Sequence, residues 1–370
     1  MAPRSRFITL LSAVGITLVS YIPMTAQQTR ILTAEKHNEY GLVYSLPITA
    51  LEIEVSARKE VLTAGPYAAY ARKYIGTDKV ITHDAERWTI TDVKVKTYGT
   101  LDTDAKYIMQ LKPGALTFIG VSEDGMLLSI NKEPASLPKP ANNRPEAPVK
   151  LFDGKEYLKY VDEDFTASQS TAKQAQMLSE SLMEARDAHI SLTRGTADNM
   201  PVDGRQLELM LNSLQAQEDA LTAAFTGTVT AETVTNTYTY LPEDNGKEIL
   251  FRFADFKGFT EPDDLAGFPV YINVAITAQG ELPVDANGNV KMLPKDAVRY
   301  CIPGSAQISL TAEGKKLFAK EFDFSQFGVE FGLNPSLFTD RKEPSYAVFN
   351  PTTGAIVEIG SARELKRQDD

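Results

Sequence analysis

The chain has 370 residues and a formal net charge of −11 at pH 7, with 38 lysines and arginines against 49 aspartates and glutamates. This acidic balance argues against binding to DNA or RNA and against electrostatic adhesion to anionic lipid, because both need a basic surface. The only cysteine, Cys301, excludes an internal disulfide, so the fold must rest on its hydrophobic core. The length allows two domains.

Residues 1–26 have the pattern of a secretion signal. Arg4 and Arg6 form a positive start, residues 7–19 are mostly apolar, and Ala26 ends a small-residue cleavage site. The apolar run is shorter than the roughly 20 residues that a membrane-spanning helix needs. We therefore expect an exported protein without a transmembrane segment in the mature chain.

Residues 27–131 are predicted to form an N-terminal β-rich domain. Apolar Leu51, Ile53 and Val55 alternate with glutamates, which is typical of a strand with one buried face. A short helix over residues 66–75 interrupts this pattern, with tyrosines at helical spacing. We expect the helix to pack its aromatic side on the sheet; the alternative is that the tyrosines line a binding surface.

Residues 132–165 are rich in proline at their start. The composition of this segment suits an extended linker and provides the best domain boundary in the chain. The alternative is a strap that lies across the surface of the protein. The prolines are Pro134, Pro138, Pro140, Pro145 and Pro148.

Residues 166–227 are predicted to form an antiparallel helical hairpin. The first helix covers roughly residues 168–192, and the second begins with Asp203 as its N-cap and ends at Gly227. Each helix carries an apolar stripe, which we expect to pack on the flanking sheets; the alternative is a docking surface for a partner. The stripes are Ala175, Leu178, Leu182 and Ala185, then Leu207, Leu211, Leu214, Leu221 and Phe225.

Residues 228–360 are predicted to form a C-terminal β-rich domain, followed by a charged tail at 361–370. The domain starts with a threonine-rich strand over residues 228–240 that has one exposed side. The expected fold class is therefore α+β and mostly β, with two β-rich, sandwich-like modules and a central antiparallel helical hairpin. Glycine turns between β-prone runs are predicted at Asp124-Gly125, Asn245-Gly246, Asn287-Gly288 and Thr353-Gly354.

Catalysis has one weak candidate in the sequence, the carboxylate pair Asp84 and Glu86 close to Trp88. Two carboxylates beside an aromatic ring would suit a glycan-cleaving enzyme, in which one acid has a raised pKa. The same residues are typical of a solvated loop before a strand, and we favour the loop. No serine-hydrolase or phosphate-binding motif occurs, so we predict no other catalytic residue.

Metal and cofactor binding are not predicted. The three histidines are far apart in the sequence, and none belongs to a His-Glu-x-x-His motif. Cys301 lies in an apolar run, which favours a buried and inert thiol. Residues 285–289 superficially resemble a calcium loop, but the glutamate expected later in such a loop is missing, so we predict a hairpin turn.

Five segments taken together carry a family resemblance: residues 32–47 (LTAEKHNEYGLVYSLP), 65–76, 195–204, 217–218 and 349–354 (FNPTTG). They resemble a family of exported proteins of Bacteroidota that is known as a domain of unknown function. The similarity covers nearly the whole mature chain. It implies an envelope protein of a Gram-negative bacterium, in the periplasm or at the outer membrane, and it supplies no catalytic residues.

These observations favour a non-enzymatic envelope protein that works by binding another envelope protein. The alternative is a polysaccharide-binding or glycan-cleaving protein that uses surface tyrosines with Asp84 and Glu86. We expect neither a nucleic-acid partner nor a cofactor.

Overall fold

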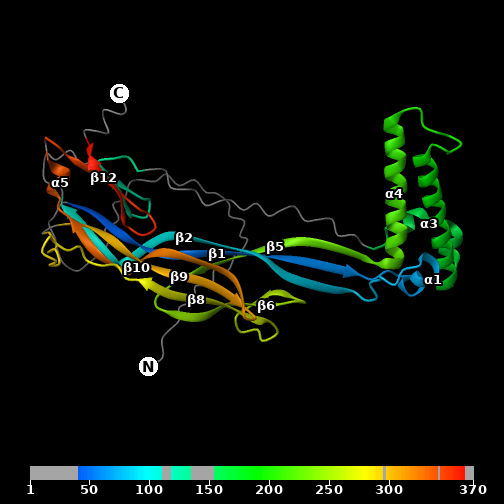
Figure 1. Cartoon of the computed structure of the whole chain (residues 1–370), viewed down its shortest axis with the longest axis horizontal. Coiled ribbons are helices and arrows are strands. Elements are labelled where there is room, and N and C mark those ends of the chain that lie inside the picture. The colour runs from blue at the N-terminus through cyan, green and yellow to red at the C-terminus, as the bar shows by residue number, and fades with distance from the viewer. Residues whose placement is uncertain (1–40, 111–117, 135–153, 295–296, 341, 363–370) are drawn as a thin grey trace, which may run out of the picture. The chain divides into compact units, whose positions relative to one another are not determined.

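The computed structural model describes residues 41–110, 118–134, 154–294, 297–340 and 342–362 (Figure 1). The predicted secretion signal, most of the proline-rich segment and most of the charged tail lie outside these residues. Within the described residues the chain forms twelve strands and five α-helices, which confirms the mostly β, α+β class. None of the described helices combines the length and the apolar character that a bilayer crossing requires.

The first sheet has three antiparallel strands in the order β2-β1-β5. The alternation predicted for β1 is confirmed, since Leu51, Ile53 and Val55 are fully buried. On the opposite face, Glu54 pairs with Lys96 of β2 at 3.0 Å. Alternating side-chain directions along a strand produce these two contrasting faces. The strands are β1 (Gly41–Thr63), β2 (Ala85–Gln110) and β5 (Thr228–Tyr240).

The second sheet has five antiparallel strands in the order β10-β9-β8-β6-β7. It packs face to face on the first sheet, and the apolar residues between the two sheets form the sandwich core. That core includes Leu51, Ile53, Phe251, Ile272, Ile308 and Phe324. The strands are β6 (Gly246–Ala254), β7 (Gly258–Thr260), β8 (Phe268–Ala278), β9 (Val298–Ala312) and β10 (Lys315–Leu333).

The third sheet has four short strands in the order β12-β11-β4-β3 and packs on Tyr44 and Met109 of the first sheet. The turns predicted at Gly125 and Gly354 are confirmed, with positive φ values of 92° and 71° that glycine adopts easily. A short helix, α5 (Ser336–Thr339), precedes β11. The strands are β3 (Ile119–Val121), β4 (Leu127–Ile130), β11 (Ser345–Phe349) and β12 (Ile356–Ser361).

Two of the three sheets take strands from both sides of the helical segment. β5 follows the helices in the chain but pairs with β1, and β11 pairs with β4 in the same way. The sandwich core also combines β1 and β2 with β6, β8, β9 and β10. Hydrogen bonding and packing therefore join the two predicted β-rich segments, while the domain boundaries themselves stay a prediction.

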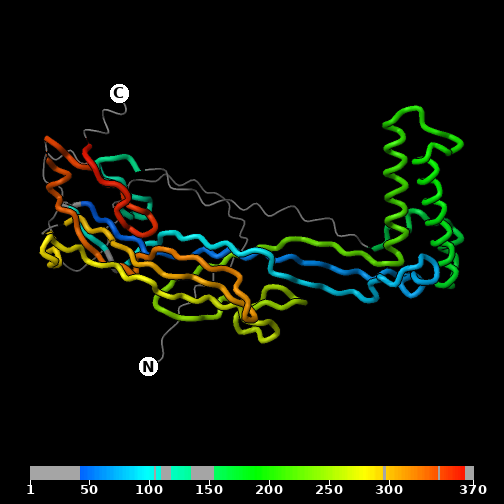
Figure 2. The backbone as a smooth tube through the Cα atoms, viewed as in Figure 1, coloured from blue at the N-terminus to red at the C-terminus, as the bar shows by residue number. Residues whose placement is uncertain are grey.

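Two long helices, α3 (Thr171–Arg194) and α4 (Gly204–Thr226), form the predicted hairpin and lie side by side (Figure 2). Ser170 caps α3 by accepting a hydrogen bond from a first-turn amide, so this helix begins later than expected. Asp203 caps α4 as predicted, with its carboxylate 3.1 Å from the Arg205 amide. The four stripe residues of α3 are all buried, whereas in α4 burial is complete only near its C-terminal end.

The hairpin packs on short helices, so the expectation that its stripes pack on the flanking sheets is wrong. The buried residues of this helical cluster are Tyr67, Ala71, Tyr157, Phe165, Ala175, Leu178, Leu182, Leu221, Ala224 and Phe225, and no described strand contributes to it. The ring of Tyr67 contacts Tyr157, Phe165 and Phe225, so the short helix near it does not pack on the sheet either. The short helices are η1 (Ala68–Tyr70), α1 (Ala71–Ile75), η2 (Glu156–Tyr160) and α2 (Glu163–Ala167).

A change along the inner face of the first sheet explains this packing. Ala57 still belongs to the sandwich core, but Lys59, the next inward residue of β1, pairs with Glu86 of β2 and Glu232 of β5 at 3.5 and 3.6 Å. A charged sheet surface offers nothing complementary to an apolar helix stripe. The helices therefore bury their stripes against each other and against the short helices.

Two glycines make the junction between the sheet and the helices tight. A Cβ atom on Gly65 would lie 2.8 Å from the Ala224 carbonyl oxygen, and one on Gly227 would lie 2.5 Å from the Thr63 carbonyl oxygen. Gly227 also has a φ of 81°, which other residues rarely adopt. The predicted end of α4 at Gly227 thus lies tightly against the end of β1.

Candidate functional site

Asp84, the first residue of the predicted carboxylate pair, has a structural partner. Its Oδ1 atom accepts a hydrogen bond of 2.8 Å from the backbone amide of Ala64, which follows the end of β1. The side chain is exposed on the segment that leads into β2. The carboxylate thereby accepts the hydrogen bond of a backbone amide that no longer pairs with a neighbouring strand. This is a structural role, and it needs no substrate.

Glu86, the second residue, belongs to the charged group on the inner face of the first sheet. Besides its ion pair with Lys59, it accepts a hydrogen bond of 3.4 Å from the indole Nε1 of Trp88. The Lys59 ammonium lies 5.5 Å from the centre of the Trp88 ring, and the ring packs on Gly258 of β7. Asp84 and Glu86 therefore have separate partners, and a catalytic role for them stays a prediction.

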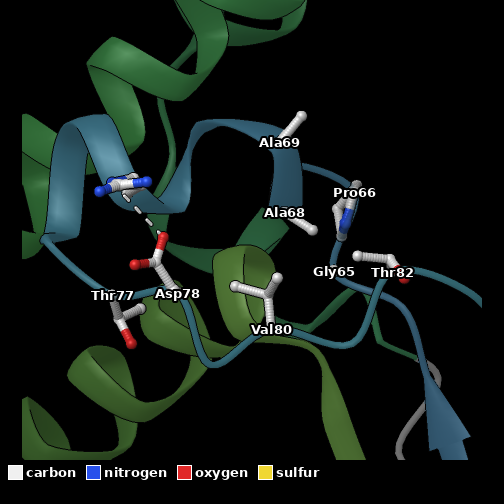
Figure 3. A pocket seen from close by; sticks show the side chains of 9 residues that line it. Gly65, Pro66, Ala68, Ala69, Thr77, Asp78, Val80 and Thr82 are labelled. Carbon is white, nitrogen blue, oxygen red and sulfur yellow. Dashed lines mark ion pairs between the residues drawn. The ribbon is translucent and has the colours of Figure 1, made fainter.

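A shallow hollow of about 540 Å³ lies beside η1 and α1 (Figure 3). Its charged groups, Arg72 and Asp78, pair with each other at 3.6 Å, and both side chains are exposed. The sequence analysis does not predict this hollow. The chain reverses direction at Gly76, which ends α1 in a left-handed conformation, and this reversal brings the two charged residues together. Ligand pockets usually bury most of the ligand surface, which an open hollow of this kind does not do. The lining residues are Gly65, Pro66, Ala68, Ala69, Arg72, Thr77, Asp78, Val80 and Thr82.

Histidine and cysteine side chains are separated in the structure. The Nδ1 atom of His189 lies 2.7 Å from Glu218 Oε1 across the helical hairpin, while His83 contacts Thr82. Cys301 is buried as expected, and burial raises the pKa of its thiol to about 12, which keeps it protonated and inert at neutral pH. Among the described residues, no three His, Cys, Asp or Glu side chains form a group that could hold a metal ion. His37 lies outside the described residues.

The segment that resembles a calcium loop is a hairpin turn, as predicted. The Asp285 carboxylate accepts hydrogen bonds from the amides of Asn287 and Asn289 at 2.8 and 2.9 Å. These backbone hydrogen bonds hold the pKa of Asp285 below its usual value. Gly288 completes the turn with a φ of 79°. The carboxylate is therefore directed at its own loop.

The turn closes a short β-ribbon, as the predicted glycine turn between β-prone runs requires. Val284 and Val290 form an antiparallel bridge, and hydrogen bonds on either side of it join Asp285 to Asn289 and Lys291 to Pro283. Strand alternation then places four apolar side chains on one face of the ribbon. We call this face the apolar ribbon: Leu282, Val284, Val290 and Met292, with exposed fractions of 41%, 55%, 57% and 92%.

The signal for the apolar ribbon was present in the sequence. Apolar residues alternate with polar ones on both sides of Asn287-Gly288, which is the pattern of a β-hairpin with one apolar face. What the pattern could not reveal is that this face remains exposed among the described residues. The apolar ribbon has a clear physical tendency to bind another molecule, because exposed apolar patches mark interaction sites.

Residues 40–357 match a protein-family model whose description is "Domain of unknown function (DUF4831)". The resemblance drawn from the sequence to a family of unknown function is thereby confirmed. No curated protein and no solved structure matches the chain.

Proposed function

Since the chain belongs to the DUF4831 family, a domain of unknown function, we propose its role from the geometry of its surface. The protein is a non-enzymatic binding or scaffold protein of the cell envelope that acts through protein–protein contacts. The observation that carries this proposal is the apolar ribbon, which presents four aligned apolar side chains to solvent.

The energetics of the apolar ribbon support a protein partner. Moving one such side chain completely from water into an apolar contact contributes about 1.5–3 kcal/mol. Three of the four are only about half exposed, so each of these contributes part of that amount, and Met292 contributes most of it. The hydrogen-bonded turn at Asp285 holds the ribbon in shape before binding, which reduces the entropy that a partner must overcome. Methionine, here the most exposed residue of the ribbon, is also enriched at protein interfaces.

The test compares two variants in a crosslinked pull-down from the native envelope, read by mass spectrometry. Val284→Thr, Val290→Thr and Met292→Gln together keep the shape of the ribbon but remove its apolar character. Val202→Thr, Val357→Thr and Met210→Gln make the same three exchanges at exposed positions elsewhere. We expect a stoichiometric partner with the wild-type and control proteins and at least a tenfold loss with the ribbon variant. Equal recovery from both variants would rule out the apolar ribbon as the contact.

We further propose that the protein is exported and acts in the periplasm or at the outer membrane of a Gram-negative bacterium. This part of the proposal is supported by the signal pattern in residues 1–26 and by the Bacteroidota resemblance of the sequence. Cell fractionation combined with N-terminal sequencing tests it. We expect a chain that starts close to Gln27 in the envelope or periplasmic fraction; an uncleaved chain in the cytoplasm contradicts export.

Glycan binding or cleavage is the second candidate, because the exposed Glu86 carboxylate touches the Trp88 indole. Most glycan-cleaving enzymes act with a pair of carboxylates, and Asp84 and Glu86 are the candidates for such a pair. The double variant Asp84→Asn and Glu86→Gln would abolish glycan hydrolysis and leave protein binding unchanged. Hydrolase panels and glycan arrays with the wild type and this variant, each checked for folding by circular dichroism, decide between the two functions.

A further inference from the structure

The outer edge of β5 is a free strand edge in the described structure. β5 pairs with β1 from Thr228 opposite Thr63 to Tyr240 opposite Leu51, without a register shift. No strand in the described ranges pairs with its other edge, which places β5 at the end of the three-stranded sheet. An edge strand presents a row of backbone donors and acceptors that another strand can pair with.

The other sheet edges are protected in ways that β5 is not. β2 and β10 carry several charged side chains, and each has register shifts in its pairing. β3 and β7 have three residues each, and β12 has six. β5 is thirteen residues long, contains no proline, and has a single charged residue, Glu232, which Lys59 already pairs with. Natural proteins usually block edges by charge, proline, irregularity or shortness, and β5 uses none of these.

The side chains of β5 hold the strand in place for pairing. On the inner face, Tyr238 stacks on Phe251 of the sandwich core with ring centres 4.6 Å apart. On the outer face, Thr235 bonds to Ser56 of β1 through a 2.9 Å contact between their hydroxyl groups. The strand is thus supported on one edge and on its inner face, and a partner would meet an edge that is already ordered.

We propose that the free edge of β5 pairs antiparallel with β5 of a second copy of this chain. The result is a continuous six-stranded sheet, β2-β1-β5-β5-β1-β2, around a two-fold axis. The interface is the same patch on both copies, as a two-fold dimer requires. This proposal does not depend on the apolar ribbon or on the proposed function.

The residues of β5 are complementary to themselves in such a pairing. With the axis at Thr235, Thr233 of one copy faces Thr237 of the other, and threonine pairs on one face stabilise antiparallel strands. Glu232 then faces Tyr238, so no like charges meet. The one charged residue of β5, Glu232, is already paired with Lys59, so it does not select a charged foreign strand. A second copy always brings the matching row of threonines. This self-complementarity favours a second copy of the chain as the partner of β5.

The first test measures the mass of the purified protein by size exclusion with light scattering over a concentration series. We expect wild type to have twice the mass of one chain and the double variant Thr235→Lys, Thr237→Lys to have the mass of one chain. Lysines there face Ser56 and Glu54 of β1, so the monomer tolerates them, while four lysines meet at the dimer axis. The matched control, Thr89→Lys with Thr100→Lys on exposed positions of β2, should remain a dimer.

A second test uses cysteine scanning and keeps the proposal testable even if the lysine variant fails to fold. Thr233→Cys, Thr235→Cys and Thr237→Cys are each treated with a short thiol crosslinker; the native Cys301 is buried and does not react. Around a two-fold axis, equal residues meet only at the centre. Moving the cysteine by two residues separates the pair by about 13 Å more. We expect one position to crosslink at least fivefold better than the others and better than Thr100→Cys.

Three outcomes overturn the proposal. They are a monomeric wild-type protein at all concentrations, a dimer that survives the β5 lysines, and cysteine crosslinking that does not depend on position. A monomer that captures a different protein through β5 would identify a foreign strand as the occupant and would also overturn it.

Discussion

The sandwich core and the helical cluster are both fully buried at their centres, but the chain assembles them in different ways. The sandwich core brings together strands from distant parts of the sequence, and burial repeats along the whole length of β9. The helical cluster comes mainly from two consecutive helices and short neighbours, and in α4 burial is complete only at Leu221, Ala224 and Phe225. Stability should therefore be uneven, with the loop end of the hairpin opening first.

The largest expected effect is a cavity in the sandwich core. Phe251 is buried and stacks on Tyr238 of the facing sheet, so Phe251→Ala should lower the free energy of unfolding by about 3–5 kcal/mol. Chemical denaturation measures this loss. The exposed Phe256, in the turn between β6 and β7, is the matched control, and Phe256→Ala should change stability by no more than about 0.5 kcal/mol. Similar losses for both variants would contradict the buried packing of Phe251.

The next effect sharpens the contrast within the helical hairpin. Leu182 of α3 is fully buried, so Leu182→Ala should cost about 2–5 kcal/mol. Leu211 of α4 is only half-buried, so the same exchange should cost about 1 kcal/mol. Hydrogen exchange should also show the amides around Leu211 exchanging faster than those around Leu221. Equal costs and equal exchange rates would mean that the hairpin is uniformly packed.

A smaller effect is expected at the junction between the two regions. Gly227→Ala introduces a Cβ into a backbone with positive φ and against the Thr63 carbonyl oxygen, which should cost about 1–3 kcal/mol. The control is Gly246→Ala, where a Cβ meets no atom within 4 Å. Hydrogen exchange at α4 and β1 should rise in the first variant alone. Unchanged exchange in Gly227→Ala would show that the two regions are not coupled through this glycine.

The smallest effect concerns alkaline pH. Burial raises the pKa of Tyr238 and Tyr240 from 10.0 to about 12. A raised pKa in the folded state gives stability that is present below pH 10 and is lost as the pH approaches 12. Tyr238→Phe keeps the ring on Phe251 and should make this loss shallower, whereas Tyr98→Phe on an exposed position should not. Denaturation curves between pH 9 and 12 measure both slopes, and identical slopes would argue against a buried Tyr238 hydroxyl.

Local features of both regions were predictable from residues close together in the sequence. The alternation at Leu51, Ile53 and Val55, the N-cap at Asp203 and the glycine turn at Gly354 depend on neighbours within a few positions. The partners of each element were not predictable in this way. Residues of the candidate site show the same limit, because the proximity of Glu86 to Trp88 is local, whereas its ion pair with Lys59 depends on strand register.

The sequence alone determined the alternation of β1, the two helices of the hairpin with the cap at Asp203, the turns at Gly125, Gly288 and Gly354, and membership of a family of unknown function. Only the tertiary structure decided that β5 pairs with β1, that the helical stripes avoid the sheets, and that the apolar ribbon and the edge of β5 remain open among the described residues. The physical reason is that an apolar stripe or a strand edge specifies that it must be covered, but not by which element. Which element covers a given surface depends on strand register, on the ion pairs of Lys59 and on the close approach at Gly227. Each of these involves residues that are far apart in the sequence.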